Sequence, residues 1–589
     1  MVLLTTLNSK YIHTALALYS LQAYCRRDFP AIQVKEFNIN QDLEAILGAI
    51  YRTRPSILGF STNIWNIIPT LELVERVKKV LPETVVILGG PEASADWAAL
   101  LQQPVAPDYI VCGEGEETLR QLLHYLTSGK PDRAAINGLA YKDGGRVVAT
   151  PPPAPLDLEK IPFPYPDLSV LRHRLVYYES SRGCPYRCAY CMSGWEQSTM
   201  RYLPLERVKA DLARFIEGGV GTVKMVDRTF NLDRQRTVKL LQFLAEQEGT
   251  TEFHFEMVGE LIDEEIIAIF KAAPPGRFRV EIGVQSTCPA ALEAVNRRYD
   301  LERLGRSCAA LTRIPGVTVH LDLIAGLPHE DLATFARSFD WTFRLRPAEL
   351  QLGFLKLLKG SPLRGQAGAY GYQFTSMPPY EILQSNWLSY PDLLHLKAVA
   401  VLVEKYYNSK HFHYTLSYLF RAENISPWRF FSALARYLGE EAFLGEVRKP
   451  VAYFDGLWGF LQNDLAGGAL SEREKLRDLL TLDFHLSGLG GQPPDWLTPE
   501  SPALRAVVKS ILREEEGLTK LGLPPELKPA QLRRRMVVIV LSLDPETLTT
   551  GDTPVLIYLP AQGRPRWFRL PADLCRRPEA SVKGGTAGD

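Results

Sequence analysis

The stretch Ser180-Ser-Arg-Gly-Cys-Pro-Tyr-Arg-Cys-Ala-Tyr-Cys191 contains three of the chain's eight cysteines. Cys184, Cys188 and Cys191 follow one another with the spacing C-x-x-x-C-x-x-C. Soft thiolates suit iron–sulfur clusters, and three of them in one loop can bind a cubane and leave its fourth iron open. The next histidine is His254, so no nearby side chain could complete a structural zinc site. A zinc loop and three incidental cysteines are the alternatives.

Composition is that of an ordinary globular protein, with 46% hydrophobic and 23% charged residues in 589. At about 150 residues per domain, this length suggests three or four domains. Lys+Arg and Asp+Glu are both 67, so the net charge favours neither nucleic acid nor an acidic substrate.

We expect no membrane segment and no signal peptide, because no run of about 18 apolar residues occurs and the first residues read as a strand. Eight cysteines, three of them in one loop, do not form a disulfide framework. These features predict a reduced, cytoplasmic protein that contains one cluster.

Residues 1–150 alternate apolar runs with helical patterns and predict a Rossmann-like, doubly wound parallel sheet with strands at 2–7, 57–62, 85–90 and 109–112. Such sheets bind ligands in the crevice at the carboxyl ends of their strands. The candidate ligand-binding residues at these ends are Ser61, Thr62, Asn63, Gly89, Gly90, Pro91, Glu92, Gly113, Glu114, Gly115 and Glu116.

A proline-rich linker is predicted for residues 151–174, because consecutive prolines make a stiff, extended connector. Residues 175–370 then show six strand–helix units, which predict a partial (β/α)6 TIM-type barrel with its chemistry at the carboxyl ends of the strands. Residues 371–589 predict a mainly α-helical domain with an aromatic core, two strands at 536–541 and 555–559, and a disordered tail at 581–589.

The cysteine spacing, with Tyr190 before the last cysteine, resembles the radical S-adenosylmethionine (SAM) superfamily. Gly-Gly-Pro-Glu at 89–92 and Gly-Glu-Gly-Glu at 113–116 resemble the cobalamin-binding domain that precedes many such modules. The resemblance covers residues 1–365, and the remainder is similar to a C-terminal helical domain of unknown function. The resemblance of residues 1–365 implies a 4Fe-4S cluster, SAM and cobalamin as cofactors. The D-x-H-x-x-G signature, which supplies a histidine ligand to cobalt, is absent. We therefore expect cobalamin to bind without a histidine as the lower ligand of cobalt. The alternative is a domain that has lost its cofactor.

The resemblance also implies roles for residues of the barrel. Tyr190 is expected to bind a cofactor, and Asp227 is expected to receive the amino group of SAM. The alternatives for Asp227 are a supporting role behind the site, a role facing the substrate, and a place in a surface turn. Glu281 and Gln285 share one strand face and bind the ribose and carboxylate, unless Glu281 is a buried partner of an arginine such as Arg279. The residues expected to pack on adenine, or else to be ordinary core, are Ile324, Gly326 and Leu327.

The function that the resemblance implies is methyl transfer to an unactivated carbon through a 5′-deoxyadenosyl radical and methylcobalamin. A cobalamin-assisted rearrangement or cyclisation is the first alternative. A non-catalytic cluster- or corrinoid-binding sensor is the second. The expected partners are a small-molecule, RNA or peptide substrate and a reductase or flavodoxin-type electron donor, and the chain is expected to be monomeric.

Overall fold

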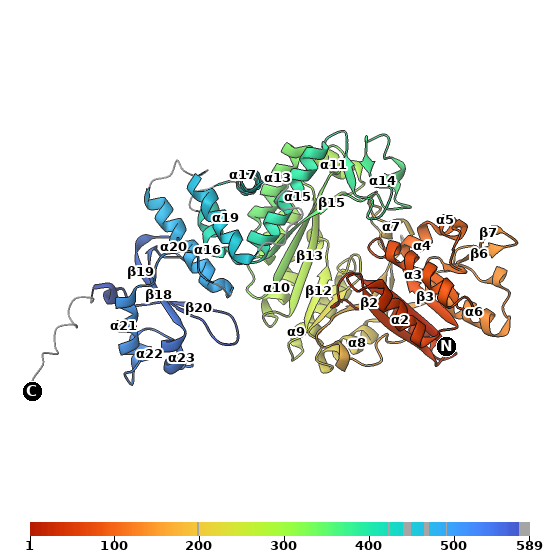
Figure 1. Cartoon of the computed structure of the whole chain (residues 1–589), viewed down its shortest axis with the longest axis horizontal. Coiled ribbons are helices and arrows are strands. Elements are labelled where there is room, and N and C mark those ends of the chain that lie inside the picture. Colours follow the sequence, from red (N-terminus) through yellow and green to blue (C-terminus); the bar gives the residue numbers. More distant parts are fainter. Residues whose placement is uncertain (197–198, 422–424, 440–448, 464–469, 490–491, 577–589) are drawn as a thin grey trace, which may run out of the picture. The chain divides into compact units, whose positions relative to one another are not determined.

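The computed structural model describes residues 1–196, 199–421, 425–439, 449–463, 470–489 and 492–576 (Figure 1). The predicted disordered tail at 581–589 lies outside the described residues. The chain divides into two compact units, one made of 1–348 with 352–393 and the other of 349–351 with 394–589. No helix in the described residues combines the length and the apolar character needed to cross a membrane.

The first unit begins with a seven-stranded sheet of order β2-β1-β3-β4-β5-β6-β7. Strands β1 to β5 are parallel, and β6 and β7 extend the sheet in antiparallel fashion. Chain order reverses between β1 and β3, which makes this the topological switch point of a doubly wound sheet. The strands are Val2–Asn8 (β1), Ile32–Asn38 (β2), Ile57–Ser61 (β3), Val85–Gly89 (β4), Tyr109–Val111 (β5), Leu139–Asp143 (β6) and Arg146–Ala149 (β7).

Helices cover both faces of this sheet, because alternate side chains of β1 enter two different cores. Leu3 and Leu7 pack with α2, α3 and α5, whereas Val2 and Leu4 pack with α1 and α6. Such two-sided burial explains the continuous apolar runs that predicted these strands. The helices are Leu16–Cys25 (α1), Leu43–Thr53 (α2), Ile67–Val80 (α3), Pro91–Ala95 (α4), Trp97–Gln102 (α5) and Gly115–Ser128 (α6).

The second sheet of this unit has six strands in the order β15-β14-β13-β12-β11-β8, and β8 to β14 run parallel. In β13 and β14 buried residues alternate with partly buried ones, so one face packs on helices and the other lines the barrel interior. This sheet and its helices confirm the predicted partial barrel. The strands are Leu175–Tyr178 (β8), Thr222–Met225 (β11), Glu252–Glu256 (β12), Phe278–Gln285 (β13), Thr318–Ala325 (β14) and Glu349–Phe354 (β15).

Aspartates fix where the barrel helices begin. Asp233, Asp263, Asp300 and Asp331 each accept a hydrogen bond from a backbone N–H in the first turn of α9, α10, α12 and α13. A capping carboxylate satisfies one of the donors left open at a helix start. The helices are Leu205–Glu217 (α8), Arg234–Glu246 (α9), Glu264–Ala272 (α10), Pro289–Ala294 (α11), Leu301–Leu311 (α12) and Leu332–Arg344 (α13).

The two sheets are joined along the edge of the barrel. Leu175 N–H donates to the Ile12 carbonyl (2.8 Å), Thr14 N–H donates to the Leu175 carbonyl (3.2 Å), and His13 bridges Leu175 in parallel. The loop after β1 therefore pairs with the edge strand β8. The remaining short elements are Ser181–Arg182 (β9), Ser193–Glu196 (α7), Arg201–Tyr202 (β10), Pro362–Gly365 (α14), Gln373–Phe374 (β16) and Ile382–Gln384 (β17).

The second unit is mainly helical and ends in a three-stranded antiparallel sheet. Buried aromatic side chains such as Phe412, Phe431 and Phe454 form its interior, which confirms the aromatic core. The short third strand β20 was not predicted. The elements are Tyr390–Leu402 (α15, which starts in the first unit), His413–Arg421 (α16), Pro427–Leu438 (α17), Pro450–Asn463 (α19), Leu470–Ser487 (α20), Pro502–Ile511 (α21), Gly517–Lys520 (α22), Pro529–Arg534 (α23), Met536–Leu543 (β18), Thr550–Tyr558 (β19) and Arg566–Arg569 (β20).

Candidate functional site

The three cysteines lie in a tight loop that leaves the barrel after β8. Cys184 and Cys188 are buried and Cys191 is partly buried. Gly183 has a φ of +105°, which glycine adopts without strain. A Cβ on Gly194 would stand 1.7 Å from the Tyr186 carbonyl oxygen, so only glycine allows this close approach. The two glycines thus allow the backbone of the loop to turn sharply and to pack closely against itself.

Contacts from elsewhere in the barrel hold this loop in place. Ala189 N–H donates to the Val295 carbonyl (2.9 Å), and the Ala189 carbonyl accepts from Leu363 N–H (2.9 Å). Asn296 Nδ2 donates to the Arg187 carbonyl (2.9 Å). The segment after α11 and the start of α14 therefore position the ligand loop.

The thiols have polar neighbours that suit thiolate ligands. Cys184 Sγ lies 3.7 Å from Thr229 Oγ1, and Arg297 Nη1 lies 3.8 Å from Cys188 Sγ. Burial raises the pKa of the Cys184 thiol, so a metal or a nearby cation is needed to favour its thiolate. In the described residues, no group of three His, Cys, Asp or Glu side chains is close enough to hold a single metal ion. A cubane takes one thiolate at each of three irons, and three cysteines in one loop fit that donor set.

Tyr190 lies within the ligand loop. Its hydroxyl is 3.5 Å from Arg297 Nη1, and burial raises its pKa well above the usual range. The phenol is therefore neutral at physiological pH. Its predicted contact with a cofactor stays a prediction.

Asp227 is fully buried behind the ligand loop, which excludes the surface-turn alternative. Its Oδ1 accepts from Ser180 Oγ (2.7 Å) and from Ser181 Oγ, and its Oδ2 accepts from Ser180 N–H (3.0 Å). Burial raises its pKa, although these hydrogen bonds oppose the shift. Both oxygens hold the strand that leads into the loop, so this geometry favours a supporting role over binding of the SAM amino group.

Glu281 lies on the interior face of the barrel, paired with residues of β11 and β12. Its Oε2 is 2.8 Å from Lys224 Nζ and 3.0 Å from His254 Nε2. Burial alone would raise its pKa, but these partners lower it far below the usual range. The predicted alternative, a buried carboxylate paired with a cation, has this type of environment, and Lys224 and His254 are partners that the sequence did not indicate.

Gln285 ends β13 in the left-handed region, with a φ of +66°, at a register shift between β13 and β14. Among the described residues its buried Oε1 has no hydrogen-bond partner. Arg297 Nη2 donates to the Gly283 carbonyl (2.6 Å) beside it. A buried acceptor without a partner, next to a buried guanidinium, fits a ligand with hydroxyl and carboxylate groups. Sequence reasoning missed Arg297, which stands in the basic run 297–298.

The three residues expected at adenine differ in their surroundings. Ile324 is partly buried on the interior face of β14. Gly326 has a φ of +95°, its carbonyl accepts from Tyr372 Oη (2.9 Å), and Ile382 leaves no space for a Cβ on it. Leu327 is fully buried. Segments after the barrel thus cover Gly326, and Ile324 is the one of the three that is not fully buried and has surface to offer a ligand.

The strand ends after β3 and β4 meet closely in the first sheet. Thr62 is fully buried, and its N–H and hydroxyl both donate to the Gly89 carbonyl (2.8 Å each). Gly90 has a φ of +97°, and a Cβ there would stand 2.4 Å from the Thr62 carbonyl oxygen. Ser61, Asn63 and Gly89 are partly buried, and Pro91 is exposed.

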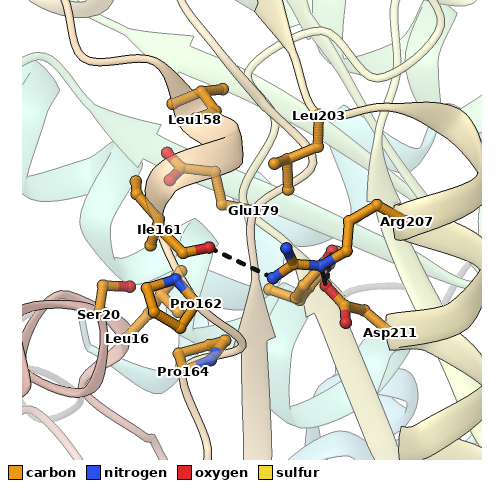
Figure 2. Close-up of a pocket in the computed structure, with 11 residues that line it drawn as sticks. Leu16, Ser20, Leu158, Ile161, Pro162, Pro164, Glu179, Leu203, Arg207 and Asp211 are labelled. Atoms are coloured by element: carbon orange, nitrogen blue, oxygen red, sulfur yellow. Dashed lines mark hydrogen bonds and ion pairs between the residues drawn. The ribbon is translucent and has the colours of Figure 1, made fainter. Parts of the chain in front are cut away.

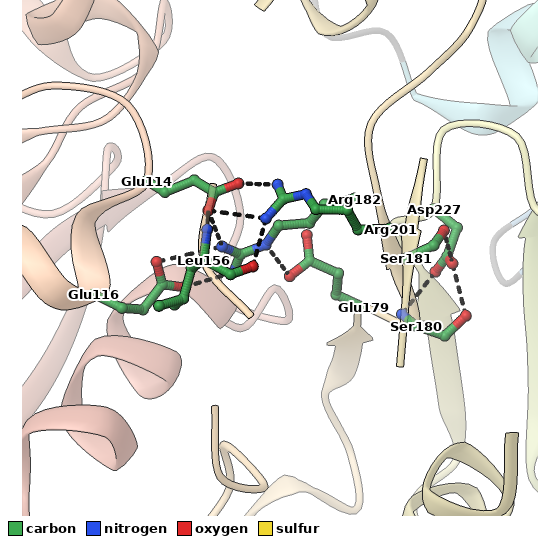
Figure 3. A network of polar contacts seen from close by, with 9 residues as sticks. All are labelled: Glu114, Glu116, Leu156, Glu179, Ser180, Ser181, Arg182, Arg201 and Asp227. Carbon is green, nitrogen blue, oxygen red and sulfur yellow. Dashed lines mark hydrogen bonds and ion pairs between the residues drawn. The ribbon is translucent and has the colours of Figure 1, made fainter. Parts of the chain in front are cut away.

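Glu92, Glu114 and Glu116 contact other protein groups. Glu92 accepts a hydrogen bond from Tyr380 Oη (2.7 Å). Glu114 pairs with Arg201, and Glu116 Oε1 lies 2.5 Å from Arg182 Nη2 (Figure 3). All three carboxylates were predicted at a cofactor; here Glu92 contacts Tyr380, and Glu114 and Glu116 contact arginines that flank the cysteine loop. The glycines of this motif remain candidates, with Gly113 exposed and Gly115 partly buried.

At the switch point, the loops after β1 and β3 carry two aromatic residues of interest. His13 Nδ1 lies 2.8 Å from Tyr177 Oη, so its ring is held at the barrel edge. Trp65 is exposed, and its Nε1 donates to the Leu7 carbonyl (3.3 Å). An exposed indole over the strand ends offers an apolar surface for a flat ligand such as a corrin.

A small cavity of about 30 Å³ lies among α1, the linker, β8 and α8 (Figure 2). This space has room for one or two water molecules and is too small for a substrate. Glu179 lines it, and burial raises the pKa of this carboxyl to about 7. On the opposite wall, Arg207 Nε lies 2.8 Å from Asp211 Oδ2 and Arg207 Nη2 donates to the Ile161 carbonyl (3.3 Å).

Family models match three consecutive parts of the chain. Residues 2–123 match the B12 binding domain, residues 178–342 the radical SAM superfamily, and residues 368–555 a protein family of unknown function, DUF4080. The chain therefore carries these domains in the predicted order.

Two curated relatives of the chain are 25% and 26% identical to it. One is an anaerobic magnesium-protoporphyrin IX monomethyl ester cyclase from Rubrivivax gelatinosus (25% identity, covering 49% of this chain and 55% of the relative). Another is the cobalamin-dependent radical SAM methyltransferase TokK from Streptomyces tokunonensis (26% identity, 48% and 44%). The chain spans about half the length of these relatives.

Among solved structures, the cobalamin-dependent SAM radical enzyme OxsB, with aqua-cobalamin and SAM bound, has the same fold. The TM-score is 0.59 at 16% identity, with 82% of this chain and 78% of that chain covered. This likeness confirms the fold class.

Proposed function

We propose that this chain, in which a B12-binding domain precedes a radical SAM domain and a DUF4080 region, is a cobalamin-dependent radical SAM enzyme that transfers a methyl group to an unactivated carbon. One observation carries the proposal: the three-cysteine loop and the strand ends of the B12-binding domain are ion-paired within one compact unit. When bound, the cluster with SAM supplies a 5′-deoxyadenosyl radical and cobalamin carries the methyl group.

On the barrel side, the residues fit the cluster and SAM. Cys184, Cys188 and Cys191 would hold three irons of the cluster. The guanidinium of Arg297 suits the carboxylate of SAM, because a buried cation binds a carboxylate through charge-assisted hydrogen bonds. The Oε1 of Gln285 can accept a hydrogen bond from a ribose hydroxyl. These residues bind and orient SAM and keep water from the reacting groups.

On the B12-binding side, Ser61, Asn63 and Gly89 offer polar and small groups at adjacent strand ends, and Trp65 offers an apolar face. This set fits a large ring with polar side groups. His13 is hydrogen-bonded to Tyr177, and this contact gives no support to a role of His13 as a cobalt ligand.

The radical SAM domain needs an electron from a donor. We propose a reductase or flavodoxin-type protein for that role, and a monomeric chain in the cytoplasm. Cysteines with free thiols among the described residues support a reducing compartment.

The test is product analysis after anaerobic reconstitution with iron, sulfide, cobalamin and methyl-labelled SAM. We expect S-adenosylhomocysteine together with 5′-deoxyadenosine, and label in the methylated product once substrate is supplied. Deoxyadenosine without S-adenosylhomocysteine would reject methylation and favour cyclisation or rearrangement, the activity class of the R. gelatinosus relative. Failure to cleave SAM at all would favour the sensor alternative.

A further inference from the structure

Two short strands form the stems of the cysteine loop. Strand β9 enters the loop and β10 leaves it, and the two pair in antiparallel register. Arg182 of β9 stands directly opposite Arg201 of β10, and Cys184 follows Arg182 by two positions. Like charges at directly opposite positions repel, so this pair destabilises the stems unless carboxylates neutralise both arginines.

The neutralising carboxylates come from the B12-binding domain. Arg182 Nη2 lies 2.5 Å from Glu116 Oε1, and Arg182 Nη1 lies 3.6 Å from Glu114 Oε2 (Figure 3). Arg201 Nη1 donates to Glu114 Oε2 (3.2 Å). The side chains of Arg182 and Glu116 are only 13% and 6% exposed, so removal of either partner leaves a buried charge uncompensated.

Glu179 and the linker residue Leu156 also bind to this network of arginines and carboxylates. Glu179 Oε2 lies 2.8 Å from Arg182 Nε. The linker residue Leu156 donates its N–H to Glu114 Oε2 (2.8 Å), and its carbonyl accepts from Arg201 Nη1 (2.6 Å). Burial would raise the pKa of Glu114, but Arg201, the Leu156 amide and Arg182 lower it, so this carboxylate stays charged.

Glu114 and Glu116 lie at the end of β5, where the chain turns into α6 and where the sheet offers its ligand crevice. A ligand seated on 113–116 therefore acts on residues that also hold the stems of the cysteine loop. We propose that Arg182 and Arg201 are positioning residues that couple the two cofactor sites, so that cobalamin and the iron–sulfur cluster strengthen each other's binding. This inference rests on the proposed function, since it requires both cofactors.

Linkage makes the coupling measurable from either side: if the cluster tightens cobalamin binding by some factor, cobalamin tightens cluster retention by the same factor. The experiment measures the dissociation constant of hydroxocobalamin for the full chain by anaerobic equilibrium dialysis, with the cluster reconstituted and after its removal. We expect the cluster-loaded wild type to bind at least threefold more tightly than the cluster-free protein.

Arg182→Met should reduce this ratio to one, as should Glu116→Gln, and Arg182→Lys should restore part of it. The matched control is Arg207→Met, which removes an arginine from a partly buried ion pair with Asp211 in the same domain. It should keep the wild-type ratio. If Arg182→Met does not fold, as judged by circular dichroism, Glu116→Gln and Arg182→Lys carry the test.

A wild-type ratio of one, or an unchanged ratio in the Arg182 and Glu116 variants, would overturn the coupling. The absence of any cobalamin binding would overturn it together with the proposed function. Coupling without SAM cleavage would leave the inference standing and reject the enzymatic function, so the two failures are distinguishable.

Discussion

Arg297 shows how one buried charge can define a ligand site. Its guanidinium reaches both the Gly283 carbonyl and the sulfur of Cys188. We predict that Arg297→Met weakens SAM binding at least tenfold, because charge-assisted hydrogen bonds contribute roughly 1.5–3 kcal/mol. Calorimetric titration of the reconstituted protein with SAM measures this. The exposed neighbour Arg298, changed to Met, should bind SAM as the wild type does. Equal affinities for both variants would contradict the assignment.

The cysteine loop makes a second prediction at this scale. Cys191→Ala should reduce iron and sulfide content after reconstitution to less than roughly half, because one of three protein ligands is lost. Cys288→Ala is the control, since Cys288 is also partly buried and lies outside the loop. Chemical analysis of iron and sulfide compares the cluster content of the two variants with that of the wild type. Full cluster content in the Cys191 variant would show that this cysteine is not a ligand.

Glu330 predicts a pH dependence of stability. It is fully buried, its Oε1 accepts from Ser286 Oγ (2.6 Å) and Ser338 Oγ (3.0 Å), and burial raises its pKa from 4.5 to about 7. Between these values the folded protein holds a proton that the unfolded chain does not. The contribution of Glu330 to the free energy of unfolding therefore falls as pH rises through this window, by up to about 3 kcal/mol.

Glu330→Gln should remove this loss, because the amide mimics the protonated acid. Urea unfolding at pH 5 and pH 8, followed by tryptophan fluorescence, compares the two proteins. An exposed carboxyl on α11, Glu293, provides the control variant Glu293→Gln. The same pH dependence in the wild type and Glu330→Gln would contradict the prediction.

Spacing along the chain predicted that Cys184, Cys188 and Cys191 share one loop, because a loop of eight residues carries its own geometry; their role as cluster ligands stays a prediction. Spacing could not predict the partners of Glu281, since Lys224 and His254 come from two other strands. Arg297 was missed for the same reason: its significance depends on Cys188, which is distant in sequence. The carboxylates Glu114 and Glu116 were found as a motif, but the arginines that they contact lie in another domain.

At the scale of elements, Gly90 makes a prediction about the turn after β4. Gly90→Ala should destabilise the B12-binding domain by about 1–3 kcal/mol from backbone strain alone, and further through the clash with the Thr62 carbonyl. Gly48→Ala in α2 is the control, because its nearest neighbour is the flexible side chain of Arg52 at 3.5 Å and alanine favours helix. Urea unfolding and cobalamin binding test both variants. Wild-type stability in Gly90→Ala would show that the turn tolerates a side chain.

Elements with strong local signals were predicted well. Strands β1, β3, β4 and β5 are buried on both sides and read as apolar runs, and aspartates mark the starts of the barrel helices. Strand β2 was missed because it lies at the sheet edge and alternates buried with exposed residues. The antiparallel pair β6 and β7 was missed because its second strand is largely exposed.

At the scale of the whole molecule, domain order followed from a few motifs, whereas the contacts between the first two domains did not. Residues 12–14 pair with β8, and Glu114 and Glu116 pair with the stems of the cysteine loop. The partners are far apart in the sequence and meet only in the folded protein, so no local pattern indicates these contacts. Those contacts place both candidate cofactor sites in one compact unit. The second unit has an apolar core of its own, formed by residues 504–574 with the sheet β18–β20.

This division predicts two thermal transitions, only one of which responds to cobalamin. A ligand present at 100 times its dissociation constant stabilises the folded state that binds it by about 2.7 kcal/mol. Because both candidate cofactor sites lie in the first unit, hydroxocobalamin should raise the midpoint of that unit's transition and leave the other unchanged. Differential scanning calorimetry of the full chain with and without hydroxocobalamin measures both midpoints. The Gly90→Ala variant identifies the first unit's transition, since the substitution lowers that midpoint alone. A shift of both transitions would show that the C-terminal unit takes part in cobalamin binding, and a shift of neither would reject the B12 site.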